Sequence, residues 1–206
     1  MTPDILFVDF DETLFNHMAY LSWVEDFLEH YGVEKGSFVR EIDQFHADLG
    51  GNMRLYDHQG HMQKISSRSW SFISGEIEKK LARSPNDCCY EDAHAFIKKA
   101  IINNDVRILT FGNGDYQRFK IKTCTLLSTL NVPIHVVDEP KSIFLNREYG
   151  SSQGILIDDK YPLNLPKGWR HIWIARNDLR AKPQALVDGA IKISSLAQYQ
   201  TALGLM

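Results

Sequence analysis

The chain has 206 residues, of which 44% are hydrophobic and 24% charged, with a formal net charge of −3. This composition is that of an ordinary soluble globular protein, long enough for one domain with an insertion. The slight negative charge excludes a general attraction to nucleic acid or to anionic membranes. No stretch approaches the ~20 apolar residues that span a bilayer, so we expect neither kind of partner.

The three cysteines, Cys88, Cys89 and Cys124, form neither a disulfide framework nor a zinc motif. The first apolar run is short and is interrupted at Asp9, unlike a secretory signal. We therefore expect a cytoplasmic protein with reduced thiols. The pattern makes no prediction about oligomeric state.

Short, continuous apolar runs predict strands that are buried on both faces of a parallel sheet. In chain order these runs are Ile5–Val8, Val106–Leu109, Ile134–Val137, Gly154–Ile157 and His171–Ala175. Helical periodicity at Tyr90–Ile102 and Tyr116–Leu130 shows that helices alternate with strands in the second half of the chain. We therefore predict a Rossmann-like α/β core of three layers around a parallel sheet.

The first and second predicted strands are separated by about 100 residues, far more than a crossover connection needs. Amphipathic helices are predicted within this interval at Met18–Tyr31, Phe38–Leu49 and Trp70–Leu81, with a turn at Gly50–Asn52. We therefore predict a mostly helical cap at residues 17–88. Residues 1–16 and 89–206 would then form the core.

Chemically reactive side chains lie at or just past the carboxyl ends of the predicted strands. They are Asp9, Asp11, Thr110, Lys141, Asp158 and Asp159. Ligands of an open α/β sheet bind beyond these ends, so the predicted fold would bring the six residues together. Two neighbouring acids, a hydroxyl, a lysine and a second acid pair form a set suited to phosphate chemistry.

The chemistry of these groups predicts a role for each. Asp9 would attack phosphorus and form an aspartyl-phosphate, which divides hydrolysis into two steps. Asp11 would protonate the departing alcohol and later activate water. Thr110 and Lys141 would bind the phosphoryl oxygens. Backbone N–H groups are expected to join them, namely those of Phe10, Phe111 and Gly112.

Crowded carboxylates push one another toward protonation, and a hard cation with oxygen ligands relieves that repulsion. Magnesium suits a site that is shared with phosphate and water. The sequence therefore predicts Mg²⁺ as the cofactor.

Together these motifs resemble those of the haloacid dehalogenase-like (HAD) superfamily, whose members include enzymes with a helical cap after the first strand. The matching segments are Asp9–Leu14, Ile108–Thr110, Lys141 and Ile155–Asp159. The resemblance implies a magnesium-dependent phosphatase that acts on a small phosphorylated metabolite, since a closing cap disfavours protein substrates.

The resemblance also implies the metal ligands. They would be Asp9, the backbone carbonyl of Asp11 and an acid of the last motif. Asp159 is the expected direct ligand, with Asp158 orienting it or binding through water, and the sequence leaves their order open.

Several alternatives stay open. Dehalogenases of this superfamily lack the second aspartate, so Asp11 favours phosphoryl transfer. A phosphotransferase or mutase would use the same residues, and a non-catalytic phosphate-binding module would keep the same fold. Many relatives carry glycine where this chain has Glu12, next to the predicted cap hinge.

Other polar residues are weaker candidates. His58 and His61 could suggest a metal pair, but no third ligand stands at suitable spacing, and their polar segment predicts a solvated cap loop. Lys120 and Lys122 compete with Lys141 for the phosphate role. Their place inside a predicted helix, away from a strand end, favours Lys141.

Overall fold

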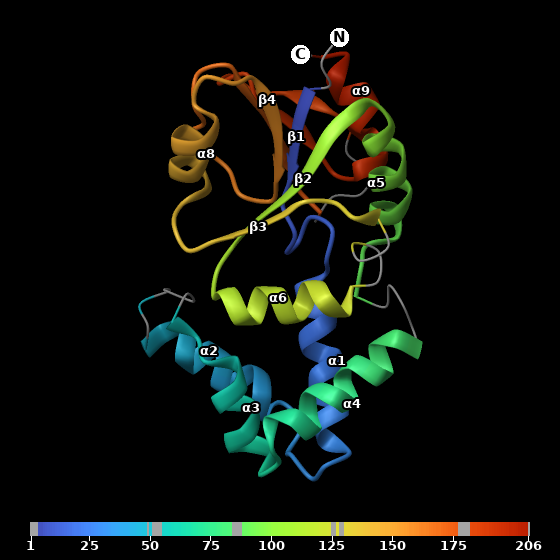
Figure 1. Cartoon of the computed structure of the whole chain (residues 1–206), viewed down its shortest axis with the longest axis vertical. Helices are drawn as coiled ribbons and strands as arrows, with labels where there is room; N and C mark the ends of the chain where they lie inside the picture. Colours follow the sequence, from blue (N-terminus) through green and yellow to red (C-terminus); the bar gives the residue numbers. More distant parts are fainter. Residues whose placement is uncertain are drawn as a thin grey trace. The chain divides into compact units, whose positions relative to one another are not determined.

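The computed structural model describes residues 4–48, 50, 55–83, 88–124, 127, 130–176 and 182–205. The chain divides into two compact units, whose elements are labelled in Figure 1. The first unit comprises Met1–Asn16, Cys89–Phe111 and Leu130–Met206. The second comprises His17–Cys88 and Gly112–Thr129.

The first unit is built on a seven-stranded sheet with the order β3-β2-β1-β4-β5-β7-β6. Its strands are β1 (Asp4–Val8), β2 (Asn104–Phe111), β3 (Ile134–Val137), β4 (Gly154–Asp158), β5 (Trp169–Ile174), β6 (Gln184–Ala185) and β7 (Ile191–Ile193). Every neighbouring pair is parallel except β6 and β7. The predicted parallel sheet is confirmed, and only the two short C-terminal strands were not foreseen.

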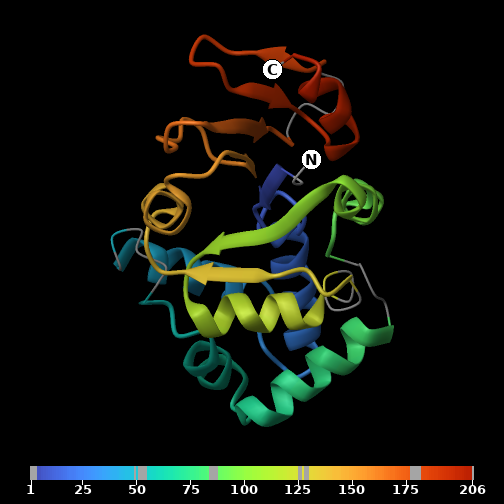
Figure 2. The same ribbon diagram turned by 45° about the horizontal axis from the view of Figure 1, so that its top comes forward.

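Helices cover both faces of this sheet. They are α5 (Glu91–Asn103), α8 (Lys141–Tyr149) and α9 (Tyr199–Leu203), which follows the short 3₁₀ helix η2 (Leu196–Gln198). In Figures 1 and 2, α8 lies on one face, and α5 and α9 lie on the other. The three-layer α/β architecture is therefore the one that the sequence predicts.

The strands are apolar throughout because both of their faces are buried. One hydrophobic cluster fills the space between the sheet and α8, and it comprises Phe7, Leu109, Val137, Phe144, Leu145, Leu156 and Trp169. Side chains alternate along a strand, so Leu6 and Val8, also fully buried, face the opposite side of the sheet. This two-sided burial explains the continuous apolar run of β1.

The strand order creates a switch point between β1 and β4. From β1 the chain adds β2 and β3 on one side, and then crosses to place β4 on the other side of β1. The connection that leaves the carboxyl end of β1 leads to β2 on one side, and the one that leaves β4 leads to β5 on the other side. A crevice at such a point is where ligands of open α/β sheets bind.

The second unit is helical. It contains α1 (His17–Glu29), α2 (Ser37–Asp48), α3 (His58–Ser66), α4 (Trp70–Arg83) and α6 (Gly114–Thr123). The helices predicted at 18–31, 38–49 and 70–81 correspond to α1, α2 and α4. The first half of the helix predicted at 116–130 corresponds to α6, which ends at Thr123. Part of the second half lies outside the described residues, and so does most of the turn predicted at 50–52.

The two compact units differ from the predicted core and cap in one respect. Residues 112–129, which include α6, group with the helices of 17–88 rather than with the sheet. The functional division into a cap at 17–88 and a core formed by 1–16 and 89–206 stays a prediction.

The solvated loop predicted around His58 and His61 is wrong. Both residues lie on α3 and are buried, with 3% and 2% of their surfaces exposed. Tyr56 pairs through its hydroxyl with His61 Nδ1 at 2.8 Å, and the ring of Phe38 stacks on His61 with centroids 5.0 Å apart. Burial lowers the pKa of both imidazoles, that of His58 to about 3, so they are neutral core residues.

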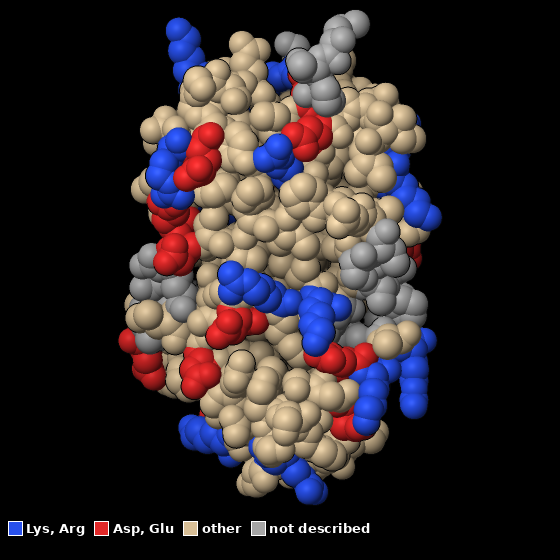
Figure 3. Space-filling model, viewed as in Figure 1, with Lys and Arg blue, Asp and Glu red and all other residues tan. Residues whose placement is uncertain are grey.

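The surface carries locally paired charges. On the described part of the face in Figure 3, Lys and Arg side chains lie beside Asp and Glu. Lys35, for example, pairs with Asp26 at 3.0 Å, and Lys122 with Glu78 at 2.8 Å. Across the described ranges, the helices are all too short or too polar to cross a bilayer.

Close packing at the start of β4 generates the first prediction. A Cβ added to Gly154 would lie 2.7 Å from the carbonyl oxygen of Ile5 and 2.8 Å from the Trp169 ring. Because neither the β1 backbone nor the buried indole yields easily, Gly154→Ala should lower the free energy of unfolding by about 1–3 kcal/mol. Urea denaturation, monitored by circular dichroism, measures this change.

Gly75 in α4 supplies the matched control, because none of the described residues has an atom within 4 Å of a Cβ added there. Gly75→Ala should be neutral or stabilising by up to about 1 kcal/mol, since alanine favours the helix. Equal effects at the two positions would contradict the close approach at Gly154.

Candidate active site

Asp9 stands where β1 ends. Its N–H donates to the carbonyl oxygen of Ile157 at 2.9 Å, which continues the pairing with β4 one residue beyond Val8. Its Oδ1 atom accepts a hydrogen bond from the N–H of Phe10 at 2.7 Å, and the residue is only 4% exposed. The main chain therefore places the Asp9 carboxylate at the β1–β4 switch point.

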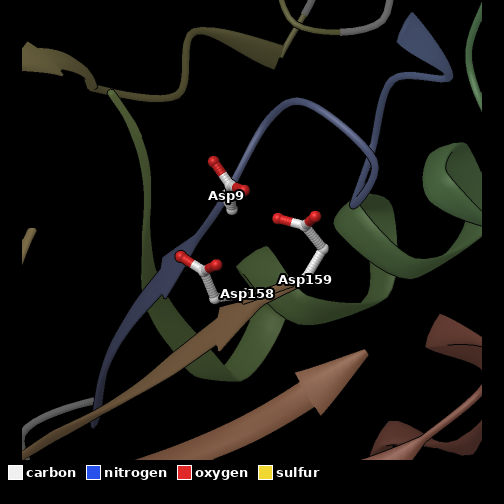
Figure 4. Close-up of side chains that lie close together, drawn as sticks. All are labelled: Asp9, Asp158 and Asp159. Atoms are coloured by element: carbon white, nitrogen blue, oxygen red, sulfur yellow. The ribbon is translucent and has the colours of Figure 1, made fainter. Parts of the chain in front are cut away.

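Strand β4 brings two further acids to this point. Asp158 is its last residue and Asp159 follows directly. One carboxylate oxygen from each of Asp9, Asp158 and Asp159 lies within 4.8 Å of the others. Figure 4 shows the three side chains gathered beyond the ends of the two strands. Of the six residues predicted to converge, these three acids therefore lie together.

Lys141 lies between two of the acids. It is the first residue of α8, and its Nζ atom is 2.6 Å from both Asp9 Oδ1 and Asp158 Oδ2. Burial opposes the charge of Lys141, but the two carboxylates outweigh it and raise its pKa. The ammonium group therefore stays charged and offsets part of the negative charge of the cluster.

The surroundings of Asp9 disfavour the ionised form of its carboxylate. Burial is the main reason that its pKa lies well above the usual range. Lys141 counteracts that effect, while repulsion from Asp158 and Asp159 adds to it. A further cation at the cluster would favour the ionised form of Asp9.

Lys160 is a site residue that sequence reasoning missed. Its N–H donates to Asp158 Oδ1 at 2.8 Å, and its Nζ atom donates to Asp159 Oδ2 at 2.6 Å. Trp173 on β5 donates from its indole N–H to the Asp159 carbonyl at 3.1 Å. The one available signal was the position of Lys160 directly after the acid pair.

Three of the predicted phosphate-binding residues, Thr110, Phe111 and Gly112, lie on β2 or just beyond it. Thr110 is buried and Phe111 is 41% exposed, and they are the last two residues of the strand. Gly112 has a φ of 146°, a conformation that essentially requires glycine, and it begins a segment of the second unit. Their contact with a phosphoryl group stays a prediction.

Asp11 lies in a tight loop after β1. The N–H groups of Leu14 and Phe15 both donate to the carbonyl oxygen of Phe10 at 2.9 Å, which folds the chain back on itself. Asp11 is half-buried, and its carboxylate is not one of the three in the described acid cluster. Its roles as acid, base and carbonyl ligand stay predictions.

The competing lysines have other partners. Lys120 is buried in the second unit, with its Nζ atom 4.5 Å from the centre of the Tyr116 ring. Lys122 is exposed and pairs with Glu78 at 2.8 Å. Lys141 touches the acid cluster, with its Nζ atom 2.6 Å from Asp9 and from Asp158.

A second network that the sequence did not reveal surrounds Arg176, just past β5. Arg176 binds both carboxylate oxygens of Asp92, at 3.0 and 2.8 Å, and also donates to the carbonyl oxygen of Thr13. Asp92 accepts further hydrogen bonds from Ser195 Oγ at 2.6 Å and from Leu196 N–H at 2.8 Å. The network ties α5, the end of β5 and the loop after β1 together.

No family model and no curated protein matches the chain. Solved structures do match along nearly the whole length. A haloacid dehalogenase-like hydrolase from Burkholderia xenovorans LB400 shares 14% identity with a TM-score of 0.65, covering 98% of each chain.

Two further structures agree. The HAD-hydrolase YfnB from Bacillus subtilis, bound to magnesium, shares 13% identity with a TM-score of 0.54, over 98% of this chain and 99% of its own. A haloacid dehalogenase-like family hydrolase from Xanthomonas campestris shares 16% identity with a TM-score of 0.55, over 100% and 96%. The chain therefore has the fold of HAD-like hydrolases, as the motifs predicted.

The Asp92–Arg176 pair generates a prediction about stability and pH. Burial opposes ionisation of Asp92, but hydrogen bonds from Arg176 and Ser195 outweigh it and lower its pKa. Asp92→Asn should therefore lower the free energy of unfolding at pH 7 by roughly 1–3 kcal/mol, as it weakens a partly buried charge pair.

The difference between Asp92→Asn and the parent should depend on pH in one direction. A lowered carboxyl pKa stabilises the fold above the unfolded-state pKa of about 3.9, and this contribution fades as pH falls through the lower folded-state value. Urea denaturation at pH 7 and at pH 3 should show the gap narrowing in acid. Asp4→Asn is the control, since Asp4 is exposed, pairs with Arg170 at only 3.8 Å, and should change stability little at either pH.

Proposed function

We propose that the protein is a magnesium-dependent phosphatase that hydrolyses a small phosphomonoester through an aspartyl-phosphate on Asp9. The observation that supports this most is the convergence of Asp9, Asp158 and Asp159 on one point, with Lys141 bound to two of them. The fold supports the proposal as well, because α/β proteins bind ligands beyond the carboxyl ends of their strands, where these residues lie.

The acid cluster fits a hard divalent cation. Its donors are carboxylate oxygens, two of its three residues are buried, and its negative charge exceeds what Lys141 offsets. Both oxygens of Asp158 accept hydrogen bonds, from Lys141 and from the Lys160 N–H. Asp9 and Asp159 would therefore hold the ion directly with the carbonyl of Asp11, and Asp158 would orient the site.

Magnesium bound there would neutralise charge and polarise a phosphoryl oxygen. The remaining chemistry belongs to the residues of the chain. In the first step, a carboxylate oxygen of Asp9 bonds to phosphorus while the ester P–O bond breaks. Asp11 gives its proton to the departing oxygen, which leaves as an alcohol.

The second step restores the enzyme. Asp11, now ionised, takes a proton from water as the water oxygen bonds to phosphorus. The bond between phosphorus and Asp9 breaks, so that inorganic phosphate leaves and the Asp9 carboxylate is regenerated. Throughout both steps, Thr110, Lys141 and nearby backbone N–H groups would bind the phosphoryl oxygens.

Asp11 favours phosphoryl transfer over dehalogenation. A halide leaves without a proton, so a carboxyl group two residues after the nucleophile has a task only when an alcohol departs. Release of inorganic phosphate without an added acceptor would distinguish a phosphatase from a phosphotransferase of the same fold. A small phosphorylated metabolite is the substrate class that we propose.

The nucleophile assignment predicts that Asp9→Asn lowers kcat by at least about 1000-fold, because an amide cannot form the phosphoryl-enzyme. Release of phosphate from 4-nitrophenyl phosphate measures the loss. Asp4→Asn, at the opposite end of β1, should keep the parent rate. Near-parental turnover by Asp9→Asn would refute the mechanism.

The metal assignment predicts that EDTA abolishes turnover and that added Mg²⁺ restores it. Asp159→Asn should weaken Mg²⁺ binding by about 10- to 100-fold in isothermal titration calorimetry, since a neutral amide replaces a charged ligand. Full activity in EDTA, or unchanged Mg²⁺ affinity in Asp159→Asn, would count against the metal site.

A further inference from the structure

Glu12, the residue after Asp11, has an unusual backbone conformation. Its φ is 55°, in the left-handed region that favours glycine. A non-glycine residue held there is strained, and it persists only where its surroundings fix it. The side chain of Glu12 must therefore contribute something that glycine would not.

That contribution is a tether. Tyr90 donates its hydroxyl proton to Glu12 Oε2 at 2.6 Å, while the Glu12 N–H donates to the carbonyl oxygen of Phe15 at 2.7 Å. Burial and the Glu12 carboxylate both raise the pKa of Tyr90, so its hydroxyl stays protonated and able to donate. The loop that contains Asp11 is thus held from its side chain as well as from its backbone.

Tyr90 itself is fixed by the chain around it. Its N–H donates to the carbonyl oxygen of Leu14 at 3.0 Å, and Phe15 forms an antiparallel bridge with Cys89. The segment that enters the long insertion therefore pairs with the segment that leaves it. This pairing brings Tyr90 beside the Asp11 loop, although 78 residues separate Tyr90 from Glu12.

Arg176 adds a third contact to the tether, because it touches both Tyr90 and the loop that contains Asp11. Its guanidinium lies 4.0 Å from the centre of the Tyr90 ring, and it donates to the carbonyl oxygen of Thr13. The two hydrogen bonds to Asp92 hold the guanidinium in place. One cation thus fixes both the tyrosine ring and the loop backbone.

We propose that Glu12, Tyr90 and Arg176 are positioning residues that hold the carboxyl group of Asp11 where the leaving oxygen of the substrate receives its proton. This inference rests on the proposed phosphatase function. Proton transfer needs the donor within hydrogen-bond reach of the leaving oxygen. A displacement of about 1 Å in such a group lowers the rate by up to about 100-fold.

A positioning role has a signature that loss of folding does not share. A poor leaving group needs the proton of Asp11, whereas a very good one departs without it. Loosening the tether should therefore slow the cleavage of poor leaving groups selectively. The parameter kcat/KM reports this step, because it ends with departure of the alcohol.

The experiment compares phenyl phosphate with 2,4-dinitrophenyl phosphate. Tyr90→Phe, which removes only the tethering hydroxyl, should lower kcat/KM for phenyl phosphate by about 10- to 100-fold. For 2,4-dinitrophenyl phosphate the loss should stay within about 3-fold, because that leaving group hardly depends on Asp11. Thermal denaturation of each variant accompanies the kinetics.

Matched variants test the parts of the tether. Glu12→Ala should reproduce the substrate-dependent loss, whereas Glu12→Gln keeps an amide oxygen for the Tyr90 hydroxyl and should rescue most of the rate. Tyr199→Phe is the control, since the buried Tyr199 hydroxyl finds no hydrogen-bond partner among the described residues, and both rates should stay at the parental level.

Each outcome decides the matter. Equal losses for both substrates, or no loss in Tyr90→Phe, overturn the positioning role while leaving the phosphatase proposal intact. Failure of the parent protein to hydrolyse either ester overturns the proposed function and this inference with it. A loss of kcat/KM that is confined to phenyl phosphate, and that Glu12→Gln largely avoids, supports both the phosphatase proposal and the positioning role.

Discussion

The main constraint on the candidate active site is the repulsion among three carboxylates that the fold brings to one point. Asp9 follows β1, Asp158 ends β4 and Asp159 comes directly after it. The parallel pairing of these strands therefore brings like charges together in a largely buried place. Lys141 offsets part of that charge, with its Nζ atom 2.6 Å from two of the acids. Burial, together with the repulsion that Lys141 does not cancel, keeps the pKa of Asp9 high. The excess negative charge makes the cluster suited to a divalent cation.

Lys141 occupies a position that is locally unfavourable for a lysine but that brings its ammonium group to the acid cluster. It is the first residue of α8, where the helix dipole favours an acid and disfavours a cation by several tenths of a kcal/mol. Pro140 precedes it and supplies no side-chain cap. Glu12 departs from local preference in the same way, since its backbone lies in a glycine-favoured region. Both exceptions fall beside the acid cluster and the Asp11 loop, where strained residues are expected to gather.

Much of the first unit was predictable because its signals are local. The apolar runs of β1 to β5 are continuous since both faces of the sheet are covered, and each of the predicted runs is a strand. The rule that ligands bind at the carboxyl ends of strands was sufficient to group Asp9, Lys141, Asp158 and Asp159. The second unit was harder, because His58 and His61 look polar and exposed in sequence, yet aromatic neighbours from other helices bury them.

The sequence by itself determined the α/β class, the long helical insertion and the acids of the cluster, because these follow from periodicity and from strand ends. Only the tertiary structure decided which groups surround those acids. Trp173 meets Asp159, and Tyr90 meets Glu12, through contacts between segments with no shared pattern. The physical reason is that a hydrogen bond depends on where two side chains lie in space, and residues as distant as Thr13 and Arg176 become neighbours only when the sheet has formed.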